Sequence, residues 1–505
     1  MAVHDGRDLP ANHRVEADLC IIGSGAAGLT IAHALVGSPH RVALLDSGGL
    51  ERDERAQDLN DGERVGLPYR PLRDTWLRQF GGTTNHWTAH VRPLDRIDFR
   101  RRPWVPHSGW PFGSDDLAPF YARARRHLRL PEHPFDLVAW AQEAHQPWPL
   151  DDVQGRSNVI RIVNLGARRL AETLGRIVRG APNVDTYLHS TVLEIVPDPT
   201  AHRIDRLRVT TDAGHEFSVR ARQYVLATGG IENARLLLLS SSVQAEGLGN
   251  RHGLVGRFFA NHFEVRAGTI TLTARQASAA FYTLHTDAHG QRYGTITIDE
   301  AQQRDHALLN PRFQLFMPRG NLGRLALHNR LERRTGAVAV EVDRLLAGTS
   351  SPPDPQPVQP FMIVAMGEPA PNPDSQVRLG DGLDRLGQRK VVLDWRLTDQ
   401  STESVRRATD LLARQLGATG LGRLHTYVHG QAPLPLQTAS FHHMGTTRMH
   451  ADPTQGVVDA TCRLHGIENL HVAGSSVFPT YGTANPTYTI MALAERLSDH
   501  LGTLL

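Results

Sequence analysis

Cysteine is scarce in this chain, since only Cys20 and Cys462 occur among 505 residues. Two cysteines at opposite ends of the sequence provide no disulfide framework, no CxxC redox pair and no CxxCH haem attachment site. No segment approaches the 18 uninterrupted apolar residues that a transmembrane helix needs. The first twenty residues contain neither the apolar core of a signal peptide nor a twin arginine. We therefore expect a cytoplasmic protein of a reducing compartment that spans no membrane.

A strong charge of one sign is also lacking. The 55 basic and 52 acidic residues leave a formal net charge of +3, and the one basic cluster, Asp95 to Trp104, is interrupted by carboxylates. Such a distribution is typical of a solvated face and excludes nucleic acid as the expected partner. The chain exceeds the usual size of one hydrophobic core, which predicts two domains or one domain with large insertions.

What the sequence does contain is a dinucleotide-binding pattern near its start. The stretch EADLCIIGSGAAGLTIAHALVGSPHRVALLD, Glu16 to Asp46, reads as a buried strand, a glycine-rich turn, a helix and a second strand that ends in an acid. Gly23 permits the tight turn, Gly25 lets the backbone approach a pyrophosphate, and Gly28 allows close packing of helix on strand. Asp46 is placed to accept hydrogen bonds from an adenosine ribose, which favours FAD or NAD over NADP.

Two further glycine-marked turns occur far along the chain. In YVLATGGIENAR a strand ends at Ala227-Thr228-Gly229, where small residues let the backbone pass close to a cofactor. In the last segment, the strand from Leu470 to Ala473 leads through Gly474-Ser475 to a helix that starts near Pro486, with Asn485 as its expected N-cap. A soluble NAD dehydrogenase would explain the first turn only. Three turns spread over the chain instead predict one FAD held by distant segments.

These motifs resemble those of the glucose-methanol-choline (GMC) family of FAD-dependent oxidoreductases. The resemblance covers nearly the whole chain. Within the family, the sequence is most similar to the pyranose oxidase and related sugar or glycoside oxidoreductase branch. It is carried by GSGAAG at Gly23, FGGTTNHWT at Phe80, SGWPFGSDDLAPFYARA at Ser108, ATGGIENAR at Ala227, FHHMGTTRM at Phe441 and GSSVFPTYGTANPTYTIMALA at Gly474.

The resemblance implies an α/β plus α+β fold, in which a Rossmann-like FAD-binding domain is interleaved with a substrate domain built on an antiparallel sheet. On this basis we expect residues 1–90, 156–260 and 436–505 to form the discontinuous FAD-binding domain. Residues 91–155 and 261–435 would then supply the substrate-binding domain and insertions.

The resemblance also assigns the three histidines of SFHHMGTTRMH, which composition and spacing leave open between a metal site, packing residues and an acid–base pair. His442 matches the family's catalytic histidine and Asn485 the second residue that handles the substrate hydroxyl. A neutral imidazole suits proton removal during hydride transfer to flavin N5. Adjacent histidines without a nearby cysteine argue against a metal, so we expect none and interpret His443 and His450 as packing or surface residues.

Cofactor contacts follow from the same matches. His86 falls where pyranose oxidases attach flavin covalently, and many relatives bind FAD without such a bond, so His86 is either the attachment point or a neighbour of the ring. Thr88 matches a position near flavin N5 and C4a. The expected cofactor-binding residues are Gly23, Gly25, Ala26, Ala27, Gly28, Asp46, Gly81, Gly82, Thr83, Asn85, His86, Thr88, Val192, Ala227, Thr228, Gly229, Gly474, Ser475, Asn485, Pro486 and Thr487.

The expected function is therefore FAD-dependent oxidation of an alcohol of a sugar or glycoside to the carbonyl. An aminoglycoside or another natural-product alcohol is the alternative, although an aminoglycoside would need an acidic pocket that no sequence motif identifies. Oxygen, a quinone or a separate protein would take the electrons, because no haem motif is present. Flavin monooxygenases and amine oxidases would lack the HHMGT and GTANPT phrases, and a non-catalytic flavin-binding electron carrier would have no need of His442.

Overall fold

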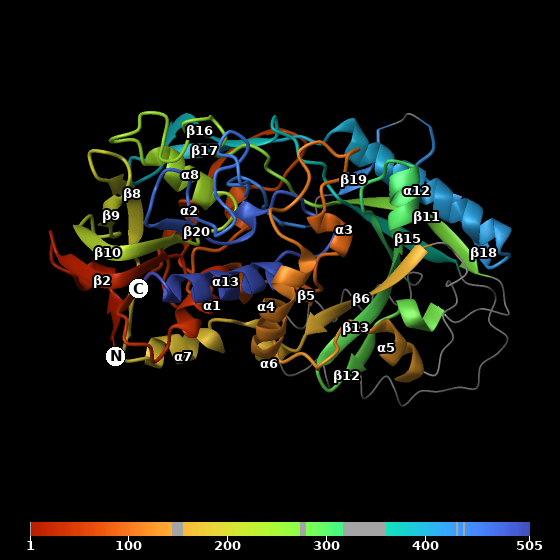
Figure 1. The fold of residues 1–505 in the computed structure, drawn as a ribbon, viewed down its shortest axis with the longest axis horizontal. Helices are drawn as coiled ribbons and strands as arrows, with labels where there is room; N and C mark the ends of the chain where they lie inside the picture. The colour runs from red at the N-terminus through yellow and green to blue at the C-terminus, as the bar shows by residue number, and fades with distance from the viewer. Residues whose placement is uncertain (1, 144–154, 273–278, 317–359, 431–432, 438–439) are drawn as a thin grey trace.

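The computed structural model of the protein describes residues 2–143, 155–272, 279–316, 360–430, 433–437 and 440–505. Two large β-sheets lie at opposite ends of the molecule, and helix α13 runs between them (Figure 1). Within the described ranges, no helix is both long and apolar enough to cross a bilayer.

The first sheet has eight strands and contains the dinucleotide-binding pattern. Its order is β1-β7-β3-β2-β10-β9-β8, with β20 also paired to β10. The pairs β1–β7, β7–β3, β3–β2, β2–β10 and β10–β20 are parallel, and β8–β9–β10 is an antiparallel meander. The strands are β1 Ala2–Asp5, β2 Arg14–Ile22, β3 Val42–Leu45, β7 Val184–Leu188, β8 Thr191–Pro197, β9 Ile204–Thr210, β10 Glu216–Leu226 and β20 Leu470–Val472.

The parallel strands at the centre of this sheet are apolar on both faces because helices cover them. All four residues of β3 are buried, as are the last four of β2. Helix α1, Ala26–Ala34, buries six of its nine residues and packs against α13, Thr487–Gly502, which in turn contacts α4, Ser114–His127. The N-terminal and C-terminal segments of the chain therefore share one layer over the sheet (Figure 1).

The second sheet has nine strands and is largely antiparallel. Its order is β18-β11-β15-β14-β13-β6-β5, with β12 paired to β13 and β19 to β11. The strands are β5 His90–Val91, β6 Gly155–Val163, β11 Phe263–Leu272, β12 His285–Asp287, β13 Gly290–Ile298, β14 Arg312–Phe316, β15 Phe361–Gly367, β18 Gly422–Thr426 and β19 Leu436–Gln437.

The central strands of this second sheet have two different faces, as the period-two geometry of a strand requires. One face carries buried apolar residues, among them Val265, Phe313 and Ile363. Helix α12, Asp399–Ala418, contacts β15 and β18 and aligns its buried residues along one stripe. The opposite face carries more polar residues, including Arg312 of β14.

A third sheet, of three strands, has the order β16-β17-β4 and joins distant parts of the chain. Its strands are β4 Gly62–Gly66, β16 Gln376–Leu383 and β17 Arg389–Trp395. The remaining α-helices in the described ranges are short: α2 Glu54–Asp58, α3 Arg96–Phe99, α5 Leu137–Glu143, α6 Leu165–Arg168, α7 Leu174–Gly180, α8 Glu232–Leu239 and α9 Glu300–Asp305. The described 3₁₀ turns are η1 Gly6–Asp8, η2 Leu72–Asp74, η3 Gly82–Asn85, η5 Ala279–Tyr282 and η6 Ser475–Val477.

The sheets agree with the expected fold class, an FAD-binding Rossmann-like unit interleaved with an antiparallel sheet. Strand β6 differs from the expected boundary at residue 156, because it pairs along its length with β13 and so belongs to the antiparallel sheet. Strand β4, from the expected FAD-binding range 1–90, pairs instead with β17. The division into two domains therefore remains a proposal.

The glycines of the first turn are required for different physical reasons. A Cβ on Gly28 would lie 1.9 Å from the carbonyl oxygen of Gly23, and a Cβ on Gly23 would lie 2.7 Å from the carbonyl oxygen of Ala227. Gly23 also has φ +100°, which side chains rarely adopt. A Cβ on Gly25, in contrast, would meet nothing within 4 Å. Gly23 and Gly28 therefore serve backbone packing, whereas Gly25 borders open space.

We predict that Gly28→Ala destabilises the protein without FAD by about 1–3 kcal/mol or more, because its Cβ must displace backbone. The matched variant Gly25→Ala should leave the stability of the FAD-free protein within about 0.5 kcal/mol and weaken FAD binding instead. Urea unfolding of the FAD-free proteins and FAD titration separate the two effects. Equal destabilisation by both substitutions would contradict the distinction.

Candidate functional site

The ends of four parallel strands meet at one edge of the eight-stranded sheet. The amide of Gly23, after β2, donates to the carbonyl of Leu45 in β3 at 2.8 Å. The amide of Ala227, after β10, donates to Ile22 O at 2.8 Å, and that of Ala473, after β20, donates to Leu226 O at 2.8 Å. Three turns that are hundreds of residues apart in sequence thus lie side by side, at the carboxyl edge where parallel sheets bind nucleotides.

Asp46 lies buried at this edge and is hydrogen-bonded to the first turn. Its Oδ2 accepts from the backbone amide of Ser24 at 3.1 Å and from the Ser24 hydroxyl, and its Oδ1 accepts from the amide of Gly48 at 2.8 Å. Burial raises the pKa of the Asp46 carboxyl, and the bonds from Ser24 and Gly48 oppose that rise. The carboxyl is therefore held in one orientation beside the glycine-rich turn.

The GGTTNHWT segment packs directly against the same turn. The amide of Gly81 donates to Ser24 Oγ at 3.0 Å, and a Cβ on Gly82 would lie 3.0 Å from Gly25 Cα. Within this segment, Thr83 Oγ1 accepts from Leu77 N at 3.3 Å, and Asn85 Nδ2 donates to Phe80 O at 2.9 Å.

The other residues expected at the cofactor differ in their burial and position. His86 and Thr88 are exposed, and Val192 lies half-buried on β8. Ala26 and Ala27 open helix α1, Gly229 follows Thr228 after β10, and Ser475 opens η6. Asn233 Oδ1 accepts from the amide of Thr228 at 2.8 Å, and its Nδ2 donates to Ala473 O at 3.0 Å, which ties the second turn to the third.

The backbone around this edge fits FAD. A Cβ on Gly25, Gly229 or Gly474 would meet no atom within 4 Å, although each of these glycines stands in a turn at the end of a central strand. Open space beside three such turns is a cradle for an extended cofactor, and the start of α1 directs backbone N–H groups into it.

His442 and Asn485, expected as the catalytic pair, lie together. His442 Nε2 is 3.4 Å from Asn485 Nδ2. The expected capping role of Asn485 is wrong, because helix α13 begins at Thr487 with Pro486 as its N-cap and without a side-chain cap bond. Asn485 is one residue too early to cap, and its side chain turns toward His442. Its buried Oδ1 has no hydrogen-bond partner among the described residues.

Sequence reasoning missed His262, which fixes the hydrogen-bonding state of His442. His262 Nε2 lies 2.8 Å from the carbonyl oxygen of Gly482 and must carry a proton to donate to it. Because the pKa of His262 is lowered to about 4, chiefly by burial, this ring is neutral and its Nδ1 is an acceptor. His442 Nδ1 lies 2.8 Å from that atom and therefore donates. The lone pair of His442 is left on Nε2, facing Asn485.

Sequence reasoning also missed a buried ion pair that holds the loop before α13. Glu368 accepts from both terminal nitrogens of Arg102, and the two side chains are 0% and 1% exposed. Glu368 Oε1 also accepts from the amide of Gly482 at 3.2 Å. Asp98 lies so close that a Cβ on Gly482 would meet its carboxyl at 2.2 Å, and burial and neighbouring acids raise the pKa of Asp98 to about 8. No local motif relates Glu368 to its partners, since it lies 266 positions from Arg102 and 114 from Gly482.

The remaining histidines of the SFHHMGTTRMH phrase have other surroundings. His443 is buried, with Nε2 2.9 Å from Tyr69 Oη and its ring edge-on to Trp76. His450 lies within a turn, where its Nδ1 accepts from the amide of Asp452 at 3.0 Å. Neither histidine is hydrogen-bonded to His442 among the described residues, so the phrase contributes one residue, His442, to the expected catalytic pair.

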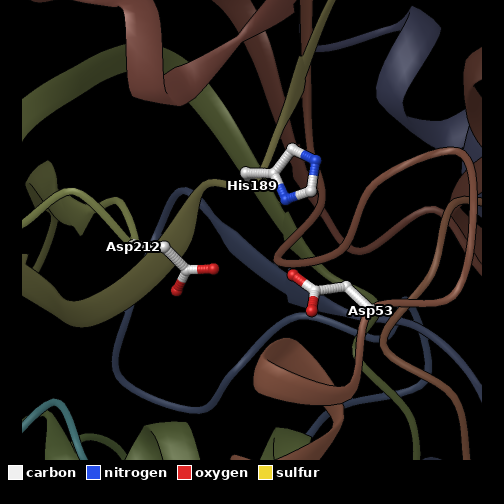
Figure 2. Close-up of side chains that lie close together, drawn as sticks. All are labelled: Asp53, His189 and Asp212. Atoms are coloured by element: carbon white, nitrogen blue, oxygen red, sulfur yellow. The ribbon is translucent and has the colours of Figure 1, made fainter.

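One group of described side chains is close enough to hold a metal ion. The ligand atoms of Asp53, His189 and Asp212 lie within 4.8 Å of one another (Figure 2). Two of the three already have partners: Asp53 caps α2 through the amide of Arg55, and Asp212 pairs with Arg385. The group is exposed to solvent in part, and these existing bonds account for both of its carboxylates.

The sheet edge, its acid and its glycine cradle define a binding site for FAD. The sequence profile of FAD dependent oxidoreductases matches residues 18–255, and that of the GMC oxidoreductases matches residues 371–494. Together these matches support a GMC-type FAD oxidoreductase that acts on CH–OH donors, and FAD is its cofactor.

Relatives match over nearly the full length. The chain is 27% identical to 6'''-hydroxyparomomycin C oxidase of Streptomyces lividus, over 95% of this chain and 90% of the relative. It is 27% identical to paromamine 6'-oxidase of Streptomyces fradiae, over 98% and 93%. The fold is similar to that of formate oxidase, with a TM-score of 0.58 and 16% identity over 98% and 99% of the chains. It also resembles pyridoxine 4-oxidase from Mesorbium loti, with a TM-score of 0.55 and 18% identity over 96% and 98%.

The buried histidines predict a stability that falls in acid. Burial lowers the pKa of His90, His262 and His471 to about 4 and that of His443 to about 3. Unfolded histidine binds a proton below about pH 6.5, whereas these folded groups stay neutral until lower pH. Their stabilisation is therefore complete above pH 6.5 and is lost between pH 6.5 and about 4, at on the order of 1–2 kcal/mol per group by pH 5.

Urea unfolding of the FAD-saturated protein at pH 7.5 and pH 5 measures this loss. His443→Gln removes one titrating group and can keep the hydrogen bond to Tyr69, so its free energy of unfolding should fall less between the two pH values than that of the wild type. An identical fall in both proteins would show that His443 does not contribute.

Proposed function

We propose that the protein oxidises a CH–OH group of a sugar or glycoside to the carbonyl, with His442 as the general base and Asn485 as the residue that orients the hydroxyl. The observation that carries this proposal is the 3.4 Å approach of His442 Nε2 to Asn485 Nδ2 at the start of α13. A substrate hydroxyl that contacts both nitrogens could donate its proton to His442 and accept a hydrogen bond from the Asn485 amide.

The two side chains divide the work that alcohol oxidation requires. Bound FAD supplies the hydride acceptor. His442 accepts the hydroxyl proton, which makes loss of hydride from the carbon easier, and Asn485 fixes the oxygen without competing for that proton. Burial keeps His442 neutral, since its pKa is lowered well below the ordinary value, and the neighbouring His262 adds to this effect.

Proton acceptance at His442 Nε2 is directed by the hydrogen bonds behind the ring. His262 accepts from His442 Nδ1 and donates to Gly482 O, so only Nε2 can receive the substrate proton. After proton transfer, His442 keeps its Nδ1 bond, because the neutral His262 ring still offers an acceptor there. The carbonyl of Gly482 belongs to the loop that carries Asn485, which couples the position of the base to that of its partner.

A sugar or glycoside substrate of the pyranose oxidase type is supported by the motif resemblance alone. An aminoglycoside hydroxyl is the second candidate, and it is favoured by the two Streptomyces relatives whose names describe paromamine and hydroxyparomomycin oxidases. For the electron acceptor, we propose oxygen, a quinone or a separate protein.

For the substrate, we predict that a member of one of these classes bleaches the oxidised flavin absorbance under anaerobic conditions. The panel contains free pyranoses, aryl glycosides and aminoglycosides, and later admission of air separates an oxidase from a dehydrogenase. His442→Ala should retain FAD and slow flavin reduction by about 10²–10⁴-fold.

His443→Gln, at the adjacent buried position, is the control and should reduce flavin at nearly the wild-type rate.

In the wild type, the rate of flavin reduction should stay constant through neutral pH and fall only at pH values below the ordinary histidine pKa, because burial lowers the pKa of His442. Wild-type rates in His442→Ala would exclude the proposed base.

The role of His262 predicts a difference between two substitutions. His262→Leu removes the acceptor for His442 Nδ1 and leaves a buried donor unsatisfied, at a cost of about 1–3 kcal/mol. That cost corresponds to a loss of roughly 5–150-fold in the flavin reduction rate. His262→Asn offers an amide oxygen near the same place and should recover part of the rate.

Stopped-flow reduction at varied substrate concentration separates the limiting rate from apparent substrate affinity. If His262 positions His442, its substitution should lower mainly the limiting rate of flavin reduction and change the apparent substrate affinity little. Equal losses in His262→Leu and His262→Asn, with FAD content unchanged, would contradict the tautomer assignment.

A further inference from the structure

Arg312 is a buried cation that contacts no anionic group among the residues that the structure describes. The arginines classed as buried in the described chain are Arg92, Arg102, Arg161, Arg235, Arg312 and Arg448. Arg102 pairs with Glu368, Arg92 with Asp95, Arg161 with Asp287 and Arg235 with Asp384. Arg448 donates to His107 O. Arg312 differs from all five, because its one hydrogen-bond acceptor is a sulfur atom.

The donors of Arg312 are almost entirely unused. Nη2 lies 3.0 Å from Met366 Sδ, a weak acceptor, and Nε and Nη1 have no partner in the described ranges. The residue is 2% exposed, so bulk water does not replace the missing partners. A buried ion without a partner costs several kcal/mol. The stability of the ligand-free protein therefore does not explain why an arginine occupies this position.

The strand register places Arg312 on the face of the antiparallel sheet opposite to that of Phe313. In β14, its neighbours Phe313 and Leu315 alternate with it, and Phe313 is fully buried among the apolar residues of the opposite face. Arg312 lies opposite Met366 of β15, and Met366 lies opposite Glu264 of β11. These three residues form one cross-strand row, in which directly opposed side chains share a face.

That row lies next to the catalytic pair. Strand β11 begins directly after Asn261 and His262, and these two residues contact His442 through its backbone amide and its Nδ1. Ser440, two residues before His442, approaches Glu264 with its hydroxyl at 3.5 Å. The charge of Arg312 also contributes to lowering the pKa of both His262 and His442, as expected for a cation close to them.

The acids near Arg312 do not neutralise it by contact. Glu264 has no ion pair among the described residues, and burial raises its pKa, which favours its uncharged form. Asp95 is engaged by Arg92 and by Asn310 Nδ2. Nε and Nη1 of Arg312 therefore have no acceptor within the described part of the chain, on the face of the sheet that also carries Glu264.

We propose that Arg312 binds an anionic oxygen group of the substrate, a carboxylate or a phosphate ester, so that the substrate is an acidic sugar derivative. This inference rests on the proposed function for the class of alcohol and adds the charge of the substrate. It makes the aminoglycoside the disfavoured substrate, because a polycation would meet a buried cation beside the base. An anion gains most from Arg312, because charge-assisted bonds to guanidinium are stronger than bonds from neutral hydroxyls.

The test uses the FAD-loaded protein and four related compounds: glucose, glucuronate, glucose 6-phosphate and glucosamine. We expect one of the two anions to exceed glucose in the second-order rate constant of anaerobic flavin reduction by at least about 10-fold, and glucosamine to fall below glucose. Arg312→Met should remove the preference for the anion. Gln314→Met, two residues along the same face of β14, is the control and should keep it.

A ligand-free measurement separates a binding arginine from a structural one. Arg312→Met replaces an unpaired buried ion by an apolar side chain beside Met366, so its thermal unfolding midpoint should equal or exceed that of the wild type. A lowered midpoint, or loss of FAD from this variant, would overturn the proposal by assigning Arg312 to the fold or to the cofactor. Arg312→Lys keeps the charge and should retain part of the anion preference if Arg312→Met does not fold.

Failure of the proposed function gives a different result. If none of the four compounds reduces the wild-type flavin, the substrate class is wrong, and Arg312 is then tested by glucuronate and phosphate binding, followed as perturbation of the flavin spectrum. Binding to the wild type that Arg312→Met abolishes supports the anion site. Equal spectra in both proteins, or a preference for glucosamine, would overturn it.

Discussion

The close backbone packing at the first glycine-rich turn is the constraint on which the site depends. Gly23 lies against the carbonyl of Ala227, and Gly28 lies against the carbonyl of Gly23, at distances that leave no room for a Cβ. This packing brings helix α1 down onto β2 and sets the end of β2 level with the end of β10. Because β20 adds to the far side of β10, the C-terminal segment reaches the same edge. A cofactor held there contacts both ends of the chain.

A buried polar network then connects that edge to the antiparallel sheet. Arg102 and Glu368 are removed from water, and such a pair contributes little net stability compared with apolar residues of similar volume. What the pair adds is position, since Glu368 also holds the amide of Gly482. The carbonyl of the same residue receives the bond from His262. The proposed base and its asparagine partner are thus located by one loop that is fixed on both sides.

Burial around the base favours its function and limits stability. Burial lowers the pKa of His442 because its charged form would be a desolvated cation, which suits the proposed role as a base at neutral pH. The same burial makes the fold sensitive to acid and leaves Arg312 without a partner. In both cases, a group that lowers the stability of the ligand-free protein is retained next to the place where the substrate must bind, as trade-offs between stability and activity predict.

Local patterns in the sequence were sufficient for the FAD-binding half of the protein. The turn at Gly23, the acid at Asp46 and the strand ending at Ala227 depend on residues within one βαβ unit or one strand end, and such short-range rules can be read from consecutive letters. The family resemblance added His442 and Asn485, which the structure brings within 3.4 Å. The capping role expected of Asn485 was wrong by one position, because local helix signals locate an end only to within a residue or two.

Tertiary structure alone decided what surrounds those two residues. His262, Glu368, Arg102 and Arg312 carry no motif that relates them to one another, and they meet because strands from distant parts of the chain pair in registers that no single strand specifies. Whether a buried arginine is paired, or which nitrogen of a histidine carries the proton, depends on partners brought together by that pairing. The sequence by itself therefore determined the cofactor and the chemistry. The hydrogen-bond direction at the base and the unpaired charge beside it arise from long-range contacts.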